Sequence, residues 1–159
     1  MSDYNKETHL GFIQGVIIRM GSNSFYCKGW AVTLFSTLLA LYFSKESTVA
    51  LLNRHAIAGI ICSILLVFWY LDSFYLRQER LFRHLYEYVR KNDDIEPYSM
   101  SCKQFQDKER FLKVMFSRTM LPMYILLIMI TVFIFYGTEI KDFATCLLKG
   151  MKECTPGSK

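Results

Sequence analysis

Apolar and polar segments alternate along the chain, and three of the apolar stretches carry no charged residue. The stretches cover roughly residues 30–43, 56–71 and 119–137, and the last reads TMLPMYILLIMITVFIFYG. A helix needs about 20 predominantly apolar residues to cross about 30 Å of hydrocarbon. The pattern therefore predicts an all-α membrane protein with three transmembrane helices.

The segment before the first span has an amphipathic pattern. Leu10, Ile13, Ile17 and Met20 recur at helical spacing, and Gly21-Ser22-Asn23-Ser24 follows as a cluster of helix-breaking residues. We therefore expect an N-terminal amphipathic helix within residues 1–24, which lies on the membrane surface or packs on the bundle. The first two transmembrane helices then occupy residues 25–71.

The pattern of the second span continues beyond Asp72. Apolar positions recur at alternating spacings of four and three, with one polar member: Leu71, Tyr75, Gln78, Phe82, Leu85 and Val89. No Gly or Pro interrupts residues 60–91, so one helix over about 56–91 is expected. After a loop at 92–106, a helical pattern resumes near Asp107 and enters the third span, where Pro122 allows a kink.

Residues 72–118 are therefore predicted to form a helical hairpin that extends the second and third spans. The third transmembrane helix is expected at 119–138. The tail, 139–159, is expected to contain a short amphipathic helix, with Ile140, Phe143, Leu147 and Met151 on one face.

Charge gives the expected orientation. Ten of the nineteen Lys and Arg residues lie in 72–118, and basic loops favour the cytoplasmic side of a membrane. The hairpin and the N-terminus are therefore expected in the cytoplasm, in a multi-pass protein of the cell membrane. The formal net charge of +5 is attributed to residues that flank spans, so direct DNA binding is not expected.

Signatures of catalysis are missing from the sequence. It contains no Gly-rich phosphate loop, no GxSxG and no HExxH, and its three His residues lie far apart. The five cysteines are scattered, without the spacing of a zinc site or a disulfide framework. An enzyme is therefore not expected, and neither a cofactor nor a metal is predicted.

Two features suggest a path for ions. Thr33, Ser36, Thr37 and Ala40 fall on one stripe of the first span, where small and hydroxylic residues serve helix packing or line a narrow aqueous path. Asp72 lies at the cytoplasmic edge of the second span, where an acid is costly unless it is paired or hydrated. It is expected either to pair with Lys113 or Arg118, or to form a ring of carboxylates at a pore mouth.

A basic face follows directly. Arg77, Arg80 and His84 share one side of the expected helix, with Arg83 beside them. The structural interpretation is a solvent-exposed face with i,i+4 pairs such as Glu79–Arg83. The functional interpretation is a site for a phosphate-bearing ligand or an acidic partner.

Two segments carry a resemblance to known proteins. FIQGVIIRMGSNSFYCKGWAVTLFSTLLALY and FWYLDSFYLRQERLFRHLYEYVR resemble a widespread group of small bacterial membrane proteins, with an "SNSF..KGW" entry to the first span and a "D..YLRQERLFR" exit from the second. The resemblance covers about residues 9–91. The layout is similar to that of SLATT-type and Hailong-type antiphage membrane effectors.

The resemblance implies an oligomeric inner-membrane effector that conducts ions in abortive antiphage defence. It also implies, as partners, a cytoplasmic nucleotidyltransferase or a nucleotide signal, other copies of the chain, and membrane lipid. The alternative is a non-conducting scaffold or regulatory subunit that docks a cytoplasmic partner through its basic helix.

Overall fold

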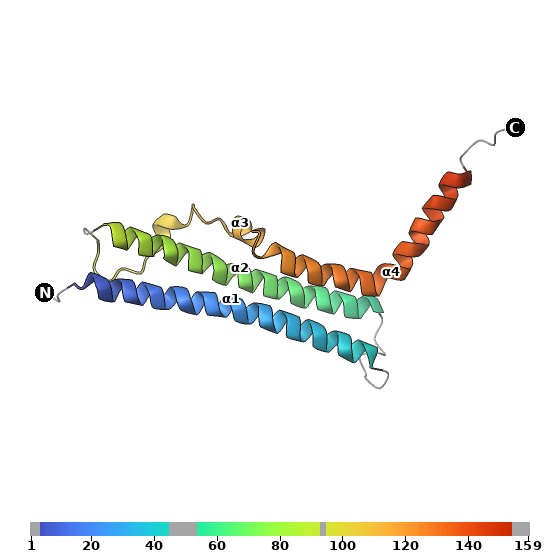
Figure 1. Cartoon of the computed structure of the whole chain (residues 1–159), viewed down its shortest axis with the longest axis horizontal. Coiled ribbons are helices and arrows are strands. Elements are labelled where there is room, and N and C mark those ends of the chain that lie inside the picture. The colour runs from blue at the N-terminus through green and yellow to red at the C-terminus, as the bar shows by residue number, and fades with distance from the viewer. Residues whose placement is uncertain (1–3, 45–53, 93–94, 154–159) are drawn as a thin grey trace.

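The computed structural model of this chain describes residues 4–44, 54–92 and 95–153, and these ranges are largely helical (Figure 1). Side chains are described for the same ranges except residue 54 and residues 138–153. Three long helices dominate the fold: α1 (Lys6–Phe43), α2 (Arg54–Lys91) and α4 (Leu121–Glu153). A short 3-10 helix, η2 (Lys103–Phe105), and a short α-helix, α3 (Phe111–Met115), lie between α2 and α4.

The long helix α2 lies at the centre of the arrangement. The antiparallel helix α1 packs along its whole length on one side, and α3 and α4 pack on the other (Figure 1). Asn5 caps the start of α1, because its Oδ1 accepts hydrogen bonds from the backbone N–H groups of Glu7 and Thr8. The three long helices therefore form a layer one helix thick.

The buried apolar side chains form two clusters along the α1–α2 pair. The first joins one half of α1 and of α2 to α4, and includes Phe35, Leu65 and Phe135. The second joins the N-terminal half of α1 to the C-terminal half of α2 and to η2, and includes Ile13, Leu85 and Phe105. Polar side chains occupy the level between the two clusters.

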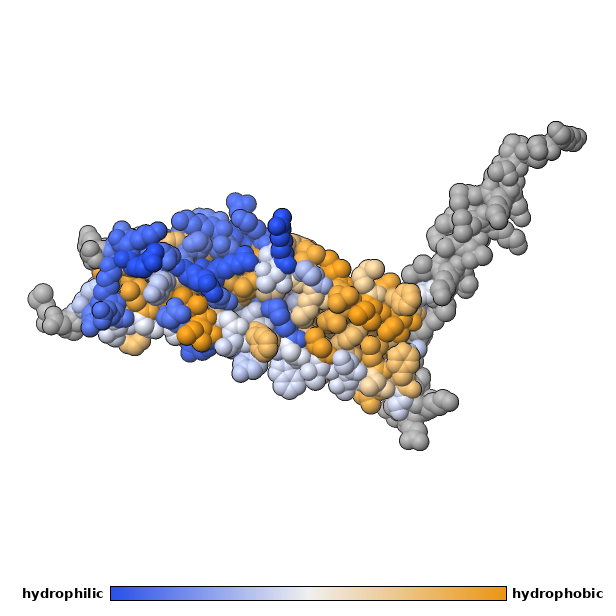
Figure 2. Space-filling model, viewed as in Figure 1, coloured by the Kyte–Doolittle hydropathy of each residue, from blue (hydrophilic) through white to orange (hydrophobic). Residues whose placement is uncertain are grey.

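The surface changes character between the two halves of the layer. Figure 2 shows one half covered by hydrophobic residues and the other largely by hydrophilic ones. Large apolar side chains are exposed on every long helix of the apolar half, among them Trp30, Phe43, Val67 and Phe133. Helices α1 and α2 are long and apolar enough to cross a membrane, and Leu121–Gly137 of α4 is a shorter apolar helix. These features fit an all-α membrane protein.

The prediction of one long second helix is confirmed, since α2 runs without interruption from Arg54 to Lys91. The prediction that a first helix ends at Gly21–Ser24 is wrong, because α1 continues through this cluster to Phe43. Gly21 and Ser24 of the cluster face α2. A Cβ at Gly21 would lie 3.4 Å from Glu79 Oε2, and Ser24 is 5% exposed. Contacts between the helices thus override the weak helix propensity of Gly and Ser.

The predicted hairpin is wrong in its second arm. The C-terminal half of α2 packs on the N-terminal half of α1 and on η2, and the chain between α2 and α4 contacts α2 without forming an inward helical extension of α4. The helical pattern near Asp107 produces only the five residues of α3, followed by a turn. Pro122 explains the break, because a proline in the first turn of α4 needs no hydrogen-bond partner but prevents the helix from continuing backwards. The predicted apolar face of the tail lies outside the described side chains.

The packing of α1 on α2 in the hydrophilic half predicts that alanine substitutions at two neighbouring residues change the free energy of unfolding by different amounts. Ile13 is fully buried and Phe12 is 56% exposed. Ile13→Ala should lower the free energy of unfolding by about 2–4 kcal/mol, because it leaves a cavity. Phe12→Ala should lower it by less than about 1 kcal/mol. Equilibrium unfolding in mixed micelles measures both, and equal losses would contradict this packing.

Candidate functional site: a buried polar network between three helices

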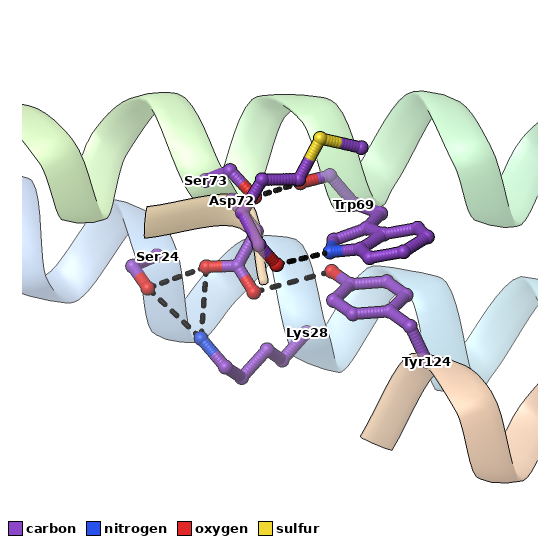
Figure 3. A network of polar contacts seen from close by, with 7 residues as sticks. Ser24, Lys28, Trp69, Asp72, Ser73 and Tyr124 are labelled. Carbon is purple, nitrogen blue, oxygen red and sulfur yellow. Dashed lines mark hydrogen bonds and ion pairs between the residues drawn. The ribbon is translucent and has the colours of Figure 1, made fainter. Parts of the chain in front are cut away.

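Asp72 lies between the two apolar clusters, at the middle of α2, and its side chain is fully buried. Three side chains from two other helices surround its carboxylate: Ser24 and Lys28 from α1 and Tyr124 from α4 (Figure 3). Ser24 and Lys28 are one helical turn apart, so both reach the same point on α2. One side chain of α2 is therefore hydrogen-bonded to both neighbouring helices.

Each carboxylate oxygen of Asp72 has its own donors. Oδ1 accepts a hydrogen bond from Ser24 Oγ at 2.5 Å and one from Lys28 Nζ at 2.8 Å. Oδ2 accepts one from Tyr124 Oη at 3.2 Å. Lys28 Nζ also donates to Ser24 Oγ at 2.9 Å. The buried charge is therefore paired with a cation and hydrogen-bonded at both oxygens, as a charge removed from water requires.

A pair of stacked aromatic rings, Trp69 and Tyr124, lies on the side of the network nearest α4. The rings of Trp69 and Tyr124 stack with centroids 6.0 Å apart, and Trp69 Nε1 donates to the backbone oxygen of Met115 at 3.1 Å (Figure 3). Beside Asp72, the buried Ser73 donates to the backbone oxygen of Trp69. These contacts attach the end of α3 to α2 beside the ion pair.

The structure corrects the predicted partners of Asp72. The carboxylate pairs with Lys28, and the predicted pairing with Lys113 or Arg118 is wrong because those two side chains are exposed on another segment. A ring of carboxylates at a pore mouth would require the network to open, since Asp72 has no exposed surface.

Sequence reasoning missed Ser24, Lys28 and Tyr124 as partners of Asp72. The sequence held a hint of contact for two of them, because Ser24 and Lys28 belong to the "SNSF..KGW" motif and Asp72 begins the "D..YLRQERLFR" motif. The network brings these two motifs together.

The basic face of α2 forms a second polar cluster. Glu109, in the loop before α3, lies against Arg77, Arg80 and His84. Arg77 Nε donates a hydrogen bond to the backbone oxygen of Glu109 at 2.7 Å. The carboxylate of Glu109 lies 3.5 Å from Arg80 and 3.3 Å from His84 Nε2. These three predicted ligand-binding residues are thus brought together, and a carboxylate of the same chain occupies the position of the expected anion.

The fourth predicted residue of this face is not part of that cluster. Arg83 bonds to Glu79 one turn earlier, with a shortest distance of 2.6 Å. This i,i+4 pair is the one expected from the structural interpretation of the face, and its arginine is largely exposed.

The predicted stripe of the first span lies on the outer side of α1. Thr33, Ser36, Thr37 and Ala40 are all exposed, whereas Ala31 and Phe35 face α2. Thr33 and Thr37 donate to the backbone oxygens of Gly29 and Thr33, respectively. The two threonine hydroxyl groups are therefore satisfied within α1, and the exposed stripe lies outside the buried core of the chain.

Other reactive groups among the described side chains are few. No group of three or more His, Cys, Asp or Glu residues in the described ranges is placed to hold a metal ion. Cys27, Cys62 and Cys102 are free thiols. Burial raises the pKa of the Cys102 thiol, so this group is protonated at neutral pH.

Loss of the carboxylate should destabilise the three-helix contact. Asp72→Ala leaves Lys28 without its counter-ion and should lower the free energy of unfolding in mixed micelles by about 3 kcal/mol. In a double-mutant cycle with Lys28→Met, the coupling energy should be about 1–3 kcal/mol. Ser73→Ala is the matched control, because this buried hydroxyl bonds only within α2. A coupling energy near zero would contradict the ion pair.

The contacts of Glu109 predict a local effect. Glu109→Gln keeps the size of the side chain but removes its charge, and should weaken the attachment of the loop by about 1 kcal/mol. Amide hydrogen exchange over residues 103–115 should then become roughly fivefold faster. Glu87→Gln is the control, since this half-exposed carboxylate pairs only with Arg90 and Lys91. Unchanged exchange in Glu109→Gln would contradict these contacts.

No protein-family model matches the sequence, and neither a curated protein nor a solved structure matches the chain.

Proposed function

We propose that several copies of this chain assemble in a bacterial inner membrane into an ion-conducting effector of antiphage defence. The observation that carries the proposal is the position of the hydroxylic stripe. Thr33, Ser36 and Thr37 lie in the apolar half of the layer, yet they are exposed and unused in packing within the chain. A polar stripe on the outer face of an apolar helix is suited to meet other copies or water rather than lipid tails.

The distribution of surface residues supports the membrane placement. The apolar half would lie in the bilayer. Helices α1 and α2 are long and apolar enough to cross it, and the shorter apolar helix Leu121–Gly137 of α4 would cross beside them. The hydrophilic half would lie in the cytoplasm, because it holds most of the basic residues of 72–118. The N-terminal half of α1 packs on the same half, so the N-terminus would also be cytoplasmic.

The layer requires several copies for conduction. Three helices in a single layer surround no central axis (Figure 1), so one chain offers no enclosed path. A ring of copies would bring the outer faces of their α1 helices together, with Thr33, Ser36, Thr37 and Ala40 toward the axis. Hydroxyl groups and small side chains leave room there for a narrow aqueous path.

The outer face of α1 is suited to contact other copies along its whole length. Exposed small residues continue the stripe into the hydrophilic half at spacings of four or seven: Gly11, Gly15, Ser22, Gly29, Ser36 and Ala40. A Cβ at Gly11, Gly15 or Gly29 would meet no atom within 4 Å. Small residues on one helix face allow close approach of a second helix, which supports self-association through α1.

Asp72 has a different part in this proposal from the one expected of a pore-lining acid. Its bonds to α1 and α4 fix the rotation of α1 about its axis, and this rotation sets the direction of the stripe. Opening would involve a change in these bonds. Asp72 would then control opening without lining the path, through its bonds at the level between the two halves.

The signal would arrive at the hydrophilic half. Arg77, Arg80, Arg83 and His84 are the candidate contacts for a cytoplasmic nucleotidyltransferase or a nucleotide, as the resemblance implies. An incoming anion would compete with Glu109, which now contacts three of the four residues. The antiphage role rests on the resemblance of the two motifs.

Conductance in liposomes tests the proposal. Purified protein should carry current, and Thr37→Leu should reduce it several-fold, because a bulky apolar side chain would narrow and dry the path. Ser63→Leu is the matched control. Ser63 is an exposed hydroxyl of α2 that bonds to its own helix, as Thr37 does, but it lies outside the stripe.

Absence of current from the assembled wild-type protein would refute the pore. In that case, a soluble partner that co-purifies with the protein, and no longer does so after charge reversal of Arg77 and Arg80, would favour the scaffold function over the pore. Equal currents from Thr37→Leu and the wild type would exclude the α1 stripe as the lining.

A further inference from the structure

The segment from Arg110 to Met120 joins the hydrophilic half to α4 at the boundary between the two halves. Its inner side is fixed to α2. The Phe111 ring lies 5.2 Å from that of Tyr70, Val114 is fully buried, and the backbone oxygen of Met115 accepts the hydrogen bond from Trp69. The segment therefore has a defined outer side.

That outer side combines positive charge with apolar side chains. Arg110, Lys113 and Arg118 are exposed, and none of the ion pairs among the described residues involves them. Leu112 is 67% exposed and Phe116 is 58% exposed. The segment contains no acidic residue, and the preceding Glu109 is directed to Arg80 and His84.

The level of this surface along α2 is set by aromatic contacts. The Phe116 ring packs edge-on against Trp69 at 5.5 Å, three residues before Asp72. The exposed rings of Tyr70 and Phe74 lie on the same stretch of α2. Aromatic residues are enriched where a membrane meets water, and basic residues beside them would reach the phosphates of that layer.

We propose that Arg110, Lys113 and Arg118, with Leu112 and Phe116, form a binding surface for anionic phospholipid of the cytoplasmic leaflet. The phosphate and the anionic headgroup would contact the three basic side chains, and the acyl chains would lie against the two apolar ones. The surface would fix the depth of the segment that connects α2 to α4. This inference rests on the membrane placement proposed above and is independent of conduction.

Fluorescence quenching tests the surface directly. The chain has two tryptophans, Trp30 and Trp69, so Trp30→Phe leaves Trp69, which contacts Phe116, as the single reporter. In vesicles, brominated phosphatidylglycerol should quench Trp69 with a relative binding constant at least about fivefold above that of brominated phosphatidylcholine, because each basic residue near an anionic surface contributes about that factor.

The variant R110Q/K113Q/R118Q, made in the Trp30→Phe protein, should reduce this preference to about one. The control R90Q/K91Q/K103Q changes the net charge equally, at exposed positions of the hydrophilic half, and should keep the preference. Helix content by circular dichroism shows whether each variant is folded, and quenching by the neutral lipid shows whether it is inserted.

Equal quenching by both lipids in the Trp30→Phe protein would overturn the lipid surface. So would an equal loss of preference in the control variant. A preference abolished by inorganic phosphate at constant ionic strength would assign the three residues to a soluble anion instead. Absence of quenching by either lipid would instead contradict the membrane placement, so the two failures are distinguishable.

Discussion

The bond between Asp72 and Lys28 lies between the hydrophilic and the apolar half of this protein, and the helices of the two halves are held together by different forces. On one side of it, α1 and α2 bury apolar side chains such as Ile13 and Leu85 beneath a hydrophilic surface, and the hydrophobic effect drives that contact. On the other side most of the exposed helix surface is apolar. There, hydrophobicity does not distinguish a neighbouring helix from a lipid tail, so shape and polar bonds must select the contacts.

The network supplies that selection. Its donors come from α1 and α4 and its acceptor from α2, so one side chain fixes the register and rotation of three helices. A charge so placed is costly to leave unpaired, and alternative packings of the apolar half would leave it so. The network therefore restricts the apolar half to one arrangement, although most of its surface lacks contacts specific enough to do this.

Periodicity predicted the helices better than it predicted their ends or their partners. The uninterrupted pattern from residue 60 to 91 predicts α2 correctly, because a long apolar repeat at helical spacing without Gly or Pro favours a continuous helix. Gly21–Ser24 misleads because its residues are weak helix formers on average, whereas here Gly21 and Ser24 contact α2. Asp72 stands out in the sequence by its position, while its partners lie 44 to 52 residues away, beyond the reach of local patterns. Glu109, in a loop, gives no periodic signal at all.

The location of the network along the helices has a mechanical consequence. Ser24 and Asp72 each lie at the midpoint of a continuous 38-residue helix, so each helix extends about 28 Å to either side. If two such rigid helices pivot about this central bond, their two ends move in opposite directions. A tilt of about 5° at the arm in the hydrophilic half would move the far end of the other arm by about 2.5 Å in the opposite direction. Such a displacement is comparable to the helix shifts of known conformational switches, which are about 1–2 Å. No flexible joint is needed between the hydrophilic end and the apolar end.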